Sequence, residues 1–259
     1  MKKIYTIRDV AQQQNHLWNN HMIADEVAAC SERNIADHFL RYLPKDEPVL
    51  EAGCGLGAWV IYLGQRGYRI AGVDNNRKVI NSLKQWDPDL NVIFGDIEHL
   101  PYDNNSLGAY ISLGVVEHFD EGPEKPLQEA FRVLKPGGVI FLTVPANNLF
   151  RQLIAHPLRR LFILYQALHG RHKYFAEYRY SSVEVRDMIV KAGFLVRETG
   201  IDDFISKTRS MTLWSEFPFL RGKGPYSLNG IGKSFAWIIN SISRKILSAG
   251  ILVIAQKGK

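Results

Sequence analysis

The stretch Pro48–Gly57, with the sequence PVLEAGCGLG, decides the fold class of this 259-residue chain. Residues 48–51 form a predicted strand, and three glycines at alternating positions follow almost directly. Glycine lets the backbone turn tightly and come close to a ligand. A strand that runs into such a loop and then into a helix is typical of an open α/β sheet, in which ligands bind beyond the carboxyl ends of the strands.

The chain beyond this loop continues to alternate between helical and strand patterns. Lys135 and the Pro-Gly-Gly that follows end one predicted helix, because a cation favours the negative helix end and these residues cannot continue a helix. The alternation predicts an α/β fold, a doubly wound and mostly parallel sheet with helices on both faces. The predicted helices are 58–66, 77–86, 126–134 and 182–192, and the predicted strands are 68–73, 90–94, 107–113, 139–144, 194–198 and 251–256.

The two interruptions of this alternation define the expected domain organisation. We expect a single domain over residues 1–259, because no low-complexity linker divides the chain. Its expected parts are an N-terminal helical cap of two helices (1–45), a ligand-binding core (46–145) and two helical insertions (146–180 and 201–248).

The composition of the chain indicates the cellular compartment in which the protein occurs. The N-terminus lacks the apolar stretch of a secretory signal, and no apolar run approaches the roughly 18 residues that span a bilayer. The chain has two cysteines, Cys30 and Cys54, and the second lies inside the glycine loop. Two thiols without an export signal predict a protein of the reducing cytoplasm.

Charge is distributed unevenly along the chain. Residues 1–146 hold 14 basic and 19 acidic side chains, whereas residues 147–259 hold 18 basic and 7 acidic ones. This asymmetry indicates that the C-terminal part meets something anionic, although a basic surface that only keeps the protein soluble fits equally well.

Polar residues follow the first three predicted strands. The glycines follow the first, Asp74 the second and Asp96 the third. A carboxylate after the second strand can accept both hydroxyls of a ribose. A carboxylate after the third can accept the amino group of adenine, with Ile97 against the ring. The series predicts a site for an adenosine cofactor.

The glycine spacing separates the candidate cofactors. Dinucleotide folds use G-x-G-x-x-G, in which a helix N-terminus meets a pyrophosphate, whereas here the pattern is Gly53-x-Gly55-x-Gly57. Glu51 precedes the first glycine by two residues, and an acid there suits a cationic ligand such as the ammonium group of a methionine moiety. A nicotinamide-dependent oxidoreductase is therefore a less favoured alternative.

Four motifs carry a family resemblance: VLEAGCGLG (49–57), AGVD (71–74), GDIEHLPYDNNSLGAYISLGVVEHF (95–119) and RVLKPGG (132–138). They resemble the successive motifs of class I S-adenosylmethionine-dependent methyltransferases, and more narrowly the branch with ubiquinone- and menaquinone-type enzymes. The resemblance implies a seven-stranded Rossmann-like sheet with an antiparallel last strand, and S-adenosylmethionine as cofactor. It also implies methyl transfer to a small-molecule or lipid-linked acceptor, with O-methylation favoured over N- or C-methylation, and insertions that form an acceptor lid.

The motif positions imply a set of cofactor-binding residues. Glu51, Gly53, Cys54, Gly55 and Gly57 would border the methionine part, and Asp74 and Asn75 the ribose. Asp96 and Ile97 would border the adenine, and the carbonyl of Leu113 the sulfonium.

A general base is needed only if the acceptor is a hydroxyl or an activated C–H group. Glu117 and His118 follow the fourth strand and are candidates, although His118 could instead bond to the backbone and shape its loop. His172 is a further candidate, with a solvated basic turn as the alternative. Trp18 could cover the cofactor or pack in the core. No metal site is expected, since the histidines are not paired with carboxylates at ligand spacing.

The segments 157–168 and 234–247 read as basic amphipathic helices. They could cap the sheet, form a homodimer interface, or contact an anionic membrane at its inner face to reach a lipid-linked acceptor. Nucleic acid is not favoured, because apolar residues interrupt the basic ones. A different functional class, a non-catalytic partner or regulator that binds S-adenosylmethionine, stays open.

Overall fold

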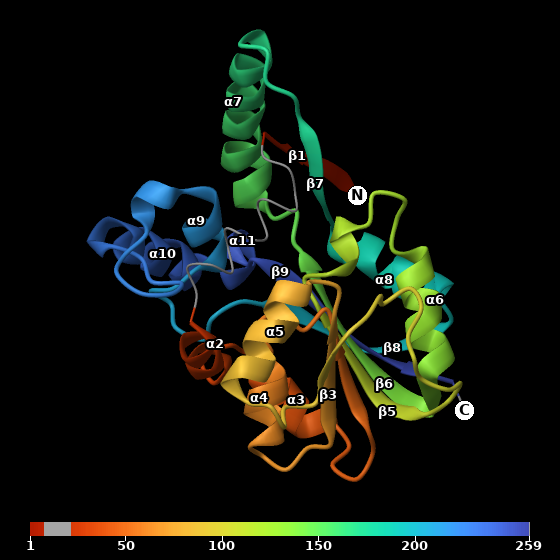
Figure 1. The fold of residues 1–259 in the computed structure, drawn as a ribbon. Coiled ribbons are helices and arrows are strands. Elements are labelled where there is room, and N and C mark those ends of the chain that lie inside the picture. The colour runs from red at the N-terminus through yellow and green to blue at the C-terminus, as the bar shows by residue number, and fades with distance from the viewer. Residues whose placement is uncertain (8–21, 259) are drawn as a thin grey trace.

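The computed structural model describes residues 1–7 and 22–258, and its centre is one seven-stranded sheet (Figure 1). The strand order is β4-β3-β2-β5-β6-β9-β8. Neighbours from β4 to β6 are parallel, and the last strand, β9, is antiparallel to both β6 and β8. The predicted fold class is confirmed. The strands are β2 (Val49–Ala52), β3 (Ile70–Asp74), β4 (Val92–Phe94), β5 (Leu107–Leu113), β6 (Leu134–Pro145), β8 (Phe194–Asp202) and β9 (Gly250–Lys257).

Two of these strands, β6 and β8, extend at least four residues beyond their predicted bounds at one end. β6 begins at Leu134, because the Lys-Pro-Gly-Gly segment belongs to an irregular extended stretch, with a register shift in its pairing to β5. β8 extends to Asp202 because β9 offers a partner over its whole length. Pairing with other strands of the sheet thus sets the first residue of β6 and the last residue of β8.

Helices cover both faces of the sheet, and each layer has its own apolar core. Side chains of α6 and α8 pack on one face, and those of α3, α4 and α5 pack on the other. Ser181 and Glu184 form a capping box at the start of α8, which fixes that helix end. The helices are α2 (Ile23–Cys30), α3 (Ile35–Tyr42), α4 (Ala58–Gly64), α5 (Arg77–Trp86), α6 (Glu124–Val133) and α8 (Ser182–Lys191).

A two-stranded ribbon stands apart from the main sheet (Figure 1). β1 (Lys2–Thr6) pairs antiparallel with β7 (Tyr174–Arg179). Both segments lie in regions that we predicted to be helical, and for these residues the prediction is wrong. Each strand is short, and its partner lies about 170 residues away in the chain, so neither carries a strong local signal.

The insertions contain the remaining helices. α7 stands up beside the ribbon, and α9 and α10 lie together at another side of the molecule (Figure 1). The predicted helix 234–247 is divided, because the backbone leaves the helix at Ser243. No helix among the described residues is long and apolar enough to span a bilayer. The elements are a π-helical turn (Arg151–Ala155), α7 (His156–Leu168), α9 (Met211–Glu216), α10 (Gly230–Ile242), α11 (Arg244–Leu247) and 3-10 turns at Val116–His118 and Pro218–Leu220.

Candidate active site

The glycine loop connects β2 to α4. It lies at the carboxyl end of β2, beside β5, where the two halves of the sheet meet. Gly53, Gly55 and Gly57 all have positive φ, at 78°, 50° and 64°. A side chain at Gly53 would be excluded, because its Cβ would lie 2.5 Å from a methyl group of Val115. The loop is therefore a close-approach surface that only glycine can build.

Asp74, at the end of β3, fixes this loop. Its two carboxylate oxygens accept hydrogen bonds from the backbone N–H groups of Gly55 (2.9 Å) and Asn76 (2.8 Å). Burial raises the pKa of the Asp74 carboxyl above its ordinary value, although these two hydrogen bonds oppose the shift. The side chain thus connects the ends of the two strands and faces the space above them.

A cavity of about 710 Å³ lies above these strand ends. It sits at the topological switch point between β2 and β5, the place where open α/β sheets bind ligands. Gly57 does not line the cavity, since it starts α4 instead. The predicted cofactor residues that line it are Glu51, Gly53, Cys54, Gly55, Asp74, Asn75, Asp96, Ile97 and Leu113.

Glu51 gives this cavity its electrostatic character. Its side chain is buried, and Oε2 has no hydrogen-bond partner among the described residues. Burial raises the pKa of the Glu51 carboxyl to about 8, so without a cation the group takes up a proton near neutral pH. A ligand with an ammonium group would supply the missing partner. The residues present therefore fit a cofactor with a cationic end and hydroxyl donors.

A second cavity of about 390 Å³ adjoins the first. The two share lining residues at the carboxyl end of β5, Leu113 and Gly114, and on β7, Ala176 and Glu177. Residues of α9 and of the adjoining loops complete its wall. Two ligands, one in each cavity, would meet at the carboxyl end of β5. Transfer of a group from one ligand to the other requires such an arrangement.

His118 and Glu117 follow β5 but face different cavities. His118 lines the first cavity, and its Nδ1 lies 2.8 Å from the carbonyl oxygen of Ala176. A carbonyl only accepts, so Nδ1 donates and Nε2 of a neutral ring keeps its lone pair. Burial disfavours the charged ring, but the Glu117 and Glu177 carboxylates outweigh it and raise the pKa of His118.

Glu117 lines the second cavity and is buried with Oε2 unpartnered among the described residues. Burial raises the pKa of its carboxyl to about 7. His172, in contrast, lies exposed between α7 and β7 and lines neither of these cavities. The geometry does not bring His172 together with the other candidates, and we leave it out of the proposed site.

Three residues of the shared wall were not found by sequence reasoning. Arg33, Glu177 and Tyr226 line both cavities, and they come from a turn between helices, from β7 and from the second insertion. None lies in a recognised motif, and no local pattern marks them. Trp18 lies outside the described residues. No group of three or more His, Cys, Asp or Glu residues that could hold a metal ion occurs in 1–7 and 22–258.

Comparison with known proteins finds methyltransferases among the relatives of this chain. Residues 50–142 match the family described as "Methyltransferase domain". The chain is 26% identical over 151 residues to a protein of Mycolicibacterium smegmatis named "Probable S-adenosylmethionine-dependent methyltransferase", covering 58% of this chain and 53% of that one. It is 30% identical over 127 residues to the malonyl-[acyl-carrier protein] O-methyltransferase of Serratia marcescens, covering 48% and 49%. The chain thus spans about half the length of these relatives.

The fold agrees as well. A SAM-dependent methyltransferase from Archaeoglobus fulgidus superposes with a TM-score of 0.58 at 16% sequence identity, covering 96% of this chain and 100% of that chain. Fold and site define a nucleoside-binding Rossmann-like protein. More particularly, residues 50–142 match the methyltransferase domain family, and the chain resembles S-adenosylmethionine-dependent methyltransferases, whose cofactor is S-adenosylmethionine.

Proposed function

We propose that the protein transfers a methyl group from S-adenosylmethionine to a hydroxyl or other oxygen of a small-molecule or lipid-linked acceptor. The observation that carries the proposal is the meeting of the two cavities at Leu113 and Gly114. The first holds the cofactor-binding residues, and the second offers room for an acceptor. The oxygen as target is supported by His118 at the first cavity and by the relative named as an O-methyltransferase.

S-Adenosylmethionine, when bound, supplies an electrophilic methyl group. Glu51 and the glycine loop would hold its methionine part, Asp74 and Asn75 the ribose, and Asp96 with Ile97 the adenine. Because these groups belong to rigid strand ends, they fix the position of the methyl donor relative to the second cavity. Holding two reactants in a reactive geometry supplies a large part of the acceleration in such displacements.

His118 would accept the proton of an acceptor hydroxyl at Nε2. Its Nδ1 hydrogen bond to Ala176 fixes the tautomer and the ring orientation. A base whose pKa lies near the working pH is the most efficient. The carboxylates of Glu117 and Glu177 would stabilise the imidazolium that forms.

A lipid-linked acceptor and contact with a membrane surface are supported by the exposed faces of the insertions. On α7, Leu161 and Leu168 are 65% and 78% exposed, and on α10, Ile231 and Ile242 are 76% and 75% exposed. The segments 147–176 and 217–259 contain no acidic residue. Apolar side chains set among basic ones suit the surface of an anionic membrane, which we propose to be the cytoplasmic face of the inner membrane.

The test uses purified protein, S-adenosylmethionine labelled in its methyl group, and acceptors from a lipid extract and from a water-soluble metabolite extract. Formation of S-adenosylhomocysteine with transfer of label into one extract is the expected result. His118→Ala should lower turnover about 100-fold or more, as loss of a general base does. The matched control His172→Ala removes an exposed histidine and should not change it.

Two outcomes would contradict the proposal. Equal activity of the His118→Ala and His172→Ala variants would exclude His118 as the base. Absence of label transfer to either extract by a folded protein that binds S-adenosylmethionine would favour a non-catalytic partner or regulator.

A further inference from the structure

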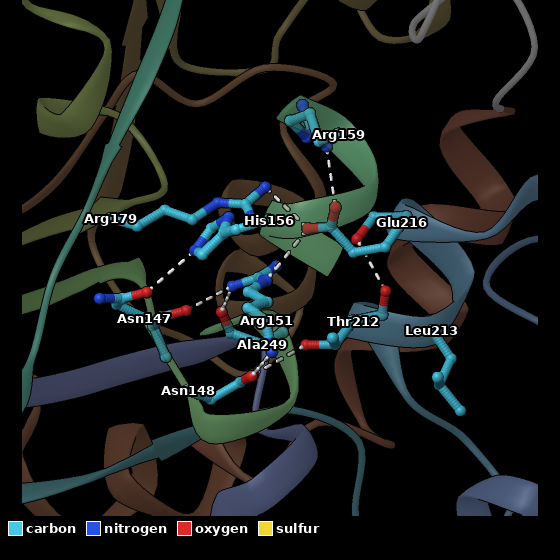
Figure 2. A network of polar contacts seen from close by, with 12 residues as sticks. Asn147, Asn148, Arg151, His156, Arg159, Arg179, Thr212, Leu213, Glu216 and Ala249 are labelled. Atoms are coloured by element: carbon cyan, nitrogen blue, oxygen red, sulfur yellow. Dashed lines mark hydrogen bonds and ion pairs between the residues drawn. The ribbon is translucent and has the colours of Figure 1, made fainter. Parts of the chain in front are cut away.

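An unusual ion-pair cluster lies in the wall of the second cavity (Figure 2). Glu216 lies on α9, and its carboxylate, on a side chain that is only 3% exposed, forms ion pairs with three arginines from different elements. Nε of Arg151 lies at 3.1 Å, Nη2 of Arg159 at 2.8 Å and Nη2 of Arg179 at 2.7 Å. The π-helical turn, α7, β7 and α9 therefore converge on one carboxylate.

The cluster carries more positive than negative charge. Arg179 has a second ion pair, to Glu177 at 2.7 Å, so three guanidinium groups face two carboxylates. Burial disfavours the Glu216 carboxylate, yet Arg179 and Arg151 lower its pKa to about 2, which shows how strongly positive the surroundings are. Burial and the neighbouring Arg179 lower the pKa of Arg151 to about 10.

Nearby acidic groups do not supply the missing negative charge. Asp202, in the same cavity wall, is already paired with Arg33 at 2.5 Å. Burial raises the pKa of the Glu117 carboxyl to about 7, although the neighbouring His118 opposes this shift, so near neutral pH Glu117 supplies only part of a negative charge. The described residues of this wall therefore leave a surplus of arginine charge.

Two arginines of this cavity wall could bind a ligand. Arg179 has an N–H group without a hydrogen-bond partner among the described residues, and Arg221 has no ion pair with them. The Arg179 side chain is only 4% exposed, and its Nη1 has no hydrogen-bond partner among the described residues. Arg221 lines the same cavity at the surface, where it donates to the carbonyl of Trp214 and forms no ion pair with a described residue. A buried donor without a partner is costly, and an anionic ligand in this cavity would supply the partner that Nη1 of Arg179 lacks among the described residues.

We propose that the second cavity binds an anionic phosphate group of the acceptor between Arg159, Arg179 and Arg221. This inference rests on the proposed function, since it names the chemical class of the acceptor that the site would methylate. Planar guanidinium groups bind such oxyanions through paired hydrogen bonds. An anion held there anchors the acceptor at one end of the cavity, with its remaining part free to extend to the end of β5.

The test is calorimetric titration of protein already saturated with S-adenosylhomocysteine. The probes are inorganic phosphate, decyl phosphate below its micelle concentration, and uncharged decanol. Binding of a phosphate probe without binding of decanol is the expected result. Inorganic phosphate binding as tightly as decyl phosphate would indicate a free oxyanion, and decyl phosphate alone would indicate a lipid headgroup.

Arg159→Gln and Arg221→Gln should each weaken phosphate binding about 10-fold, the loss expected for a charge-assisted hydrogen bond. The matched control is Arg160→Gln, an exposed arginine one residue along α7 that does not line the cavity. Its phosphate affinity should equal that of the wild type. Arg221→Gln also guards against misfolding, because Arg221 lies outside the Glu216 cluster.

Two results would overturn the inference. One is saturable binding of S-adenosylhomocysteine with no binding of either phosphate probe. The other is equal weakening by Arg159→Gln and Arg160→Gln, which would mean diffuse surface attraction. Failure to bind S-adenosylhomocysteine at all would instead refute the proposed function, so the two failures are distinguishable.

Discussion

The two ends of the active site are built in different ways. Most of the cofactor cavity is formed by strand ends and one glycine loop, and these residues lie between Glu51 and Phe119. The second cavity has fewer residues from this segment and more from β6, α9 and the two insertions. Local sequence therefore specifies most of the first cavity, whereas tertiary packing assembles the second and the wall that the two share.

The cofactor cavity and the second cavity also differ in charge. The cofactor cavity holds a buried acid, Glu51, whose Oε2 has no hydrogen-bond partner within residues 1–7 and 22–258, whereas the second cavity holds arginines in excess over carboxylates. Each cavity thus has the charge opposite to its proposed ligand. The difference suggests that one side of the site is adapted to a cationic cofactor and the other to an anionic acceptor.

The largest expected effect tests whether the Glu216 cluster holds the second cavity together. Glu216→Gln should lower the free energy of unfolding by about 3–5 kcal/mol, because it leaves buried guanidinium charge uncompensated. Urea unfolding followed by circular dichroism measures the change. The control, Glu121→Gln, removes a largely exposed carboxylate paired with Lys125 and should unfold at the wild-type midpoint. Equal midpoints for both variants would refute a structural role for the cluster.

The next effect tests the cofactor side. Asp74→Ala should weaken S-adenosylmethionine binding about 10–100-fold, since it removes a carboxylate from the cavity and the two hydrogen bonds that fix the loop. Calorimetric titration measures the affinity, and circular dichroism shows that the variant is folded. The exposed Asp89→Ala is the control, with wild-type affinity expected. Wild-type affinity of Asp74→Ala would contradict the role assigned to this residue.

A smaller effect concerns pH. The pKa of Glu51 is about 8 in the folded protein, well above its ordinary value near 4.5, so the folded state binds the proton more tightly. This raised pKa stabilises the unliganded protein fully below about pH 4.5, and the contribution is lost as the pH rises towards 8. A cationic ligand needs the ionised carboxylate, and its affinity should therefore rise between about pH 6 and 8, by at most about 10-fold per unit.

The variant Glu51→Gln separates this group from others that titrate in the same range. Its affinity for S-adenosylmethionine should be weaker than that of the wild type and nearly independent of pH over the same interval. Parallel pH profiles of the two proteins, measured by titration calorimetry, would exclude Glu51 as the partner of the ammonium group.

The smallest effect on stability is expected on α7. Leu161→Ser with Phe162→Ser should change the free energy of unfolding by about 0.5 kcal/mol or less per site, because both side chains are largely exposed. Sedimentation with phosphatidylglycerol vesicles should nevertheless decrease, whereas the control Leu195→Ser, at an exposed position of β8, should sediment like the wild type. Unchanged sedimentation, or a dimer that the double variant dissociates, would contradict membrane contact.

The cofactor side of the candidate site could be predicted from the sequence, because its residues lie in short motifs next to predicted strands. The strand ends that carry Glu51, Asp74 and Asp96 could be found because each lies next to an apolar run of strand length. The ribbon of β1 and β7 could not, because each strand is stabilised by a partner about 170 residues away in the chain. The same reason hides Arg179 and Glu216, whose surroundings exist only after the insertions have packed.

The glycine-loop cavity is expected to bind S-adenosylmethionine and no dinucleotide. Calorimetric titration of the folded protein with S-adenosylmethionine, and separately with NADH, measures both. We expect saturable binding of one S-adenosylmethionine per chain and no binding of NADH. Absence of heat with S-adenosylmethionine at millimolar concentration, or competition for the same site by NADH, would contradict this expectation.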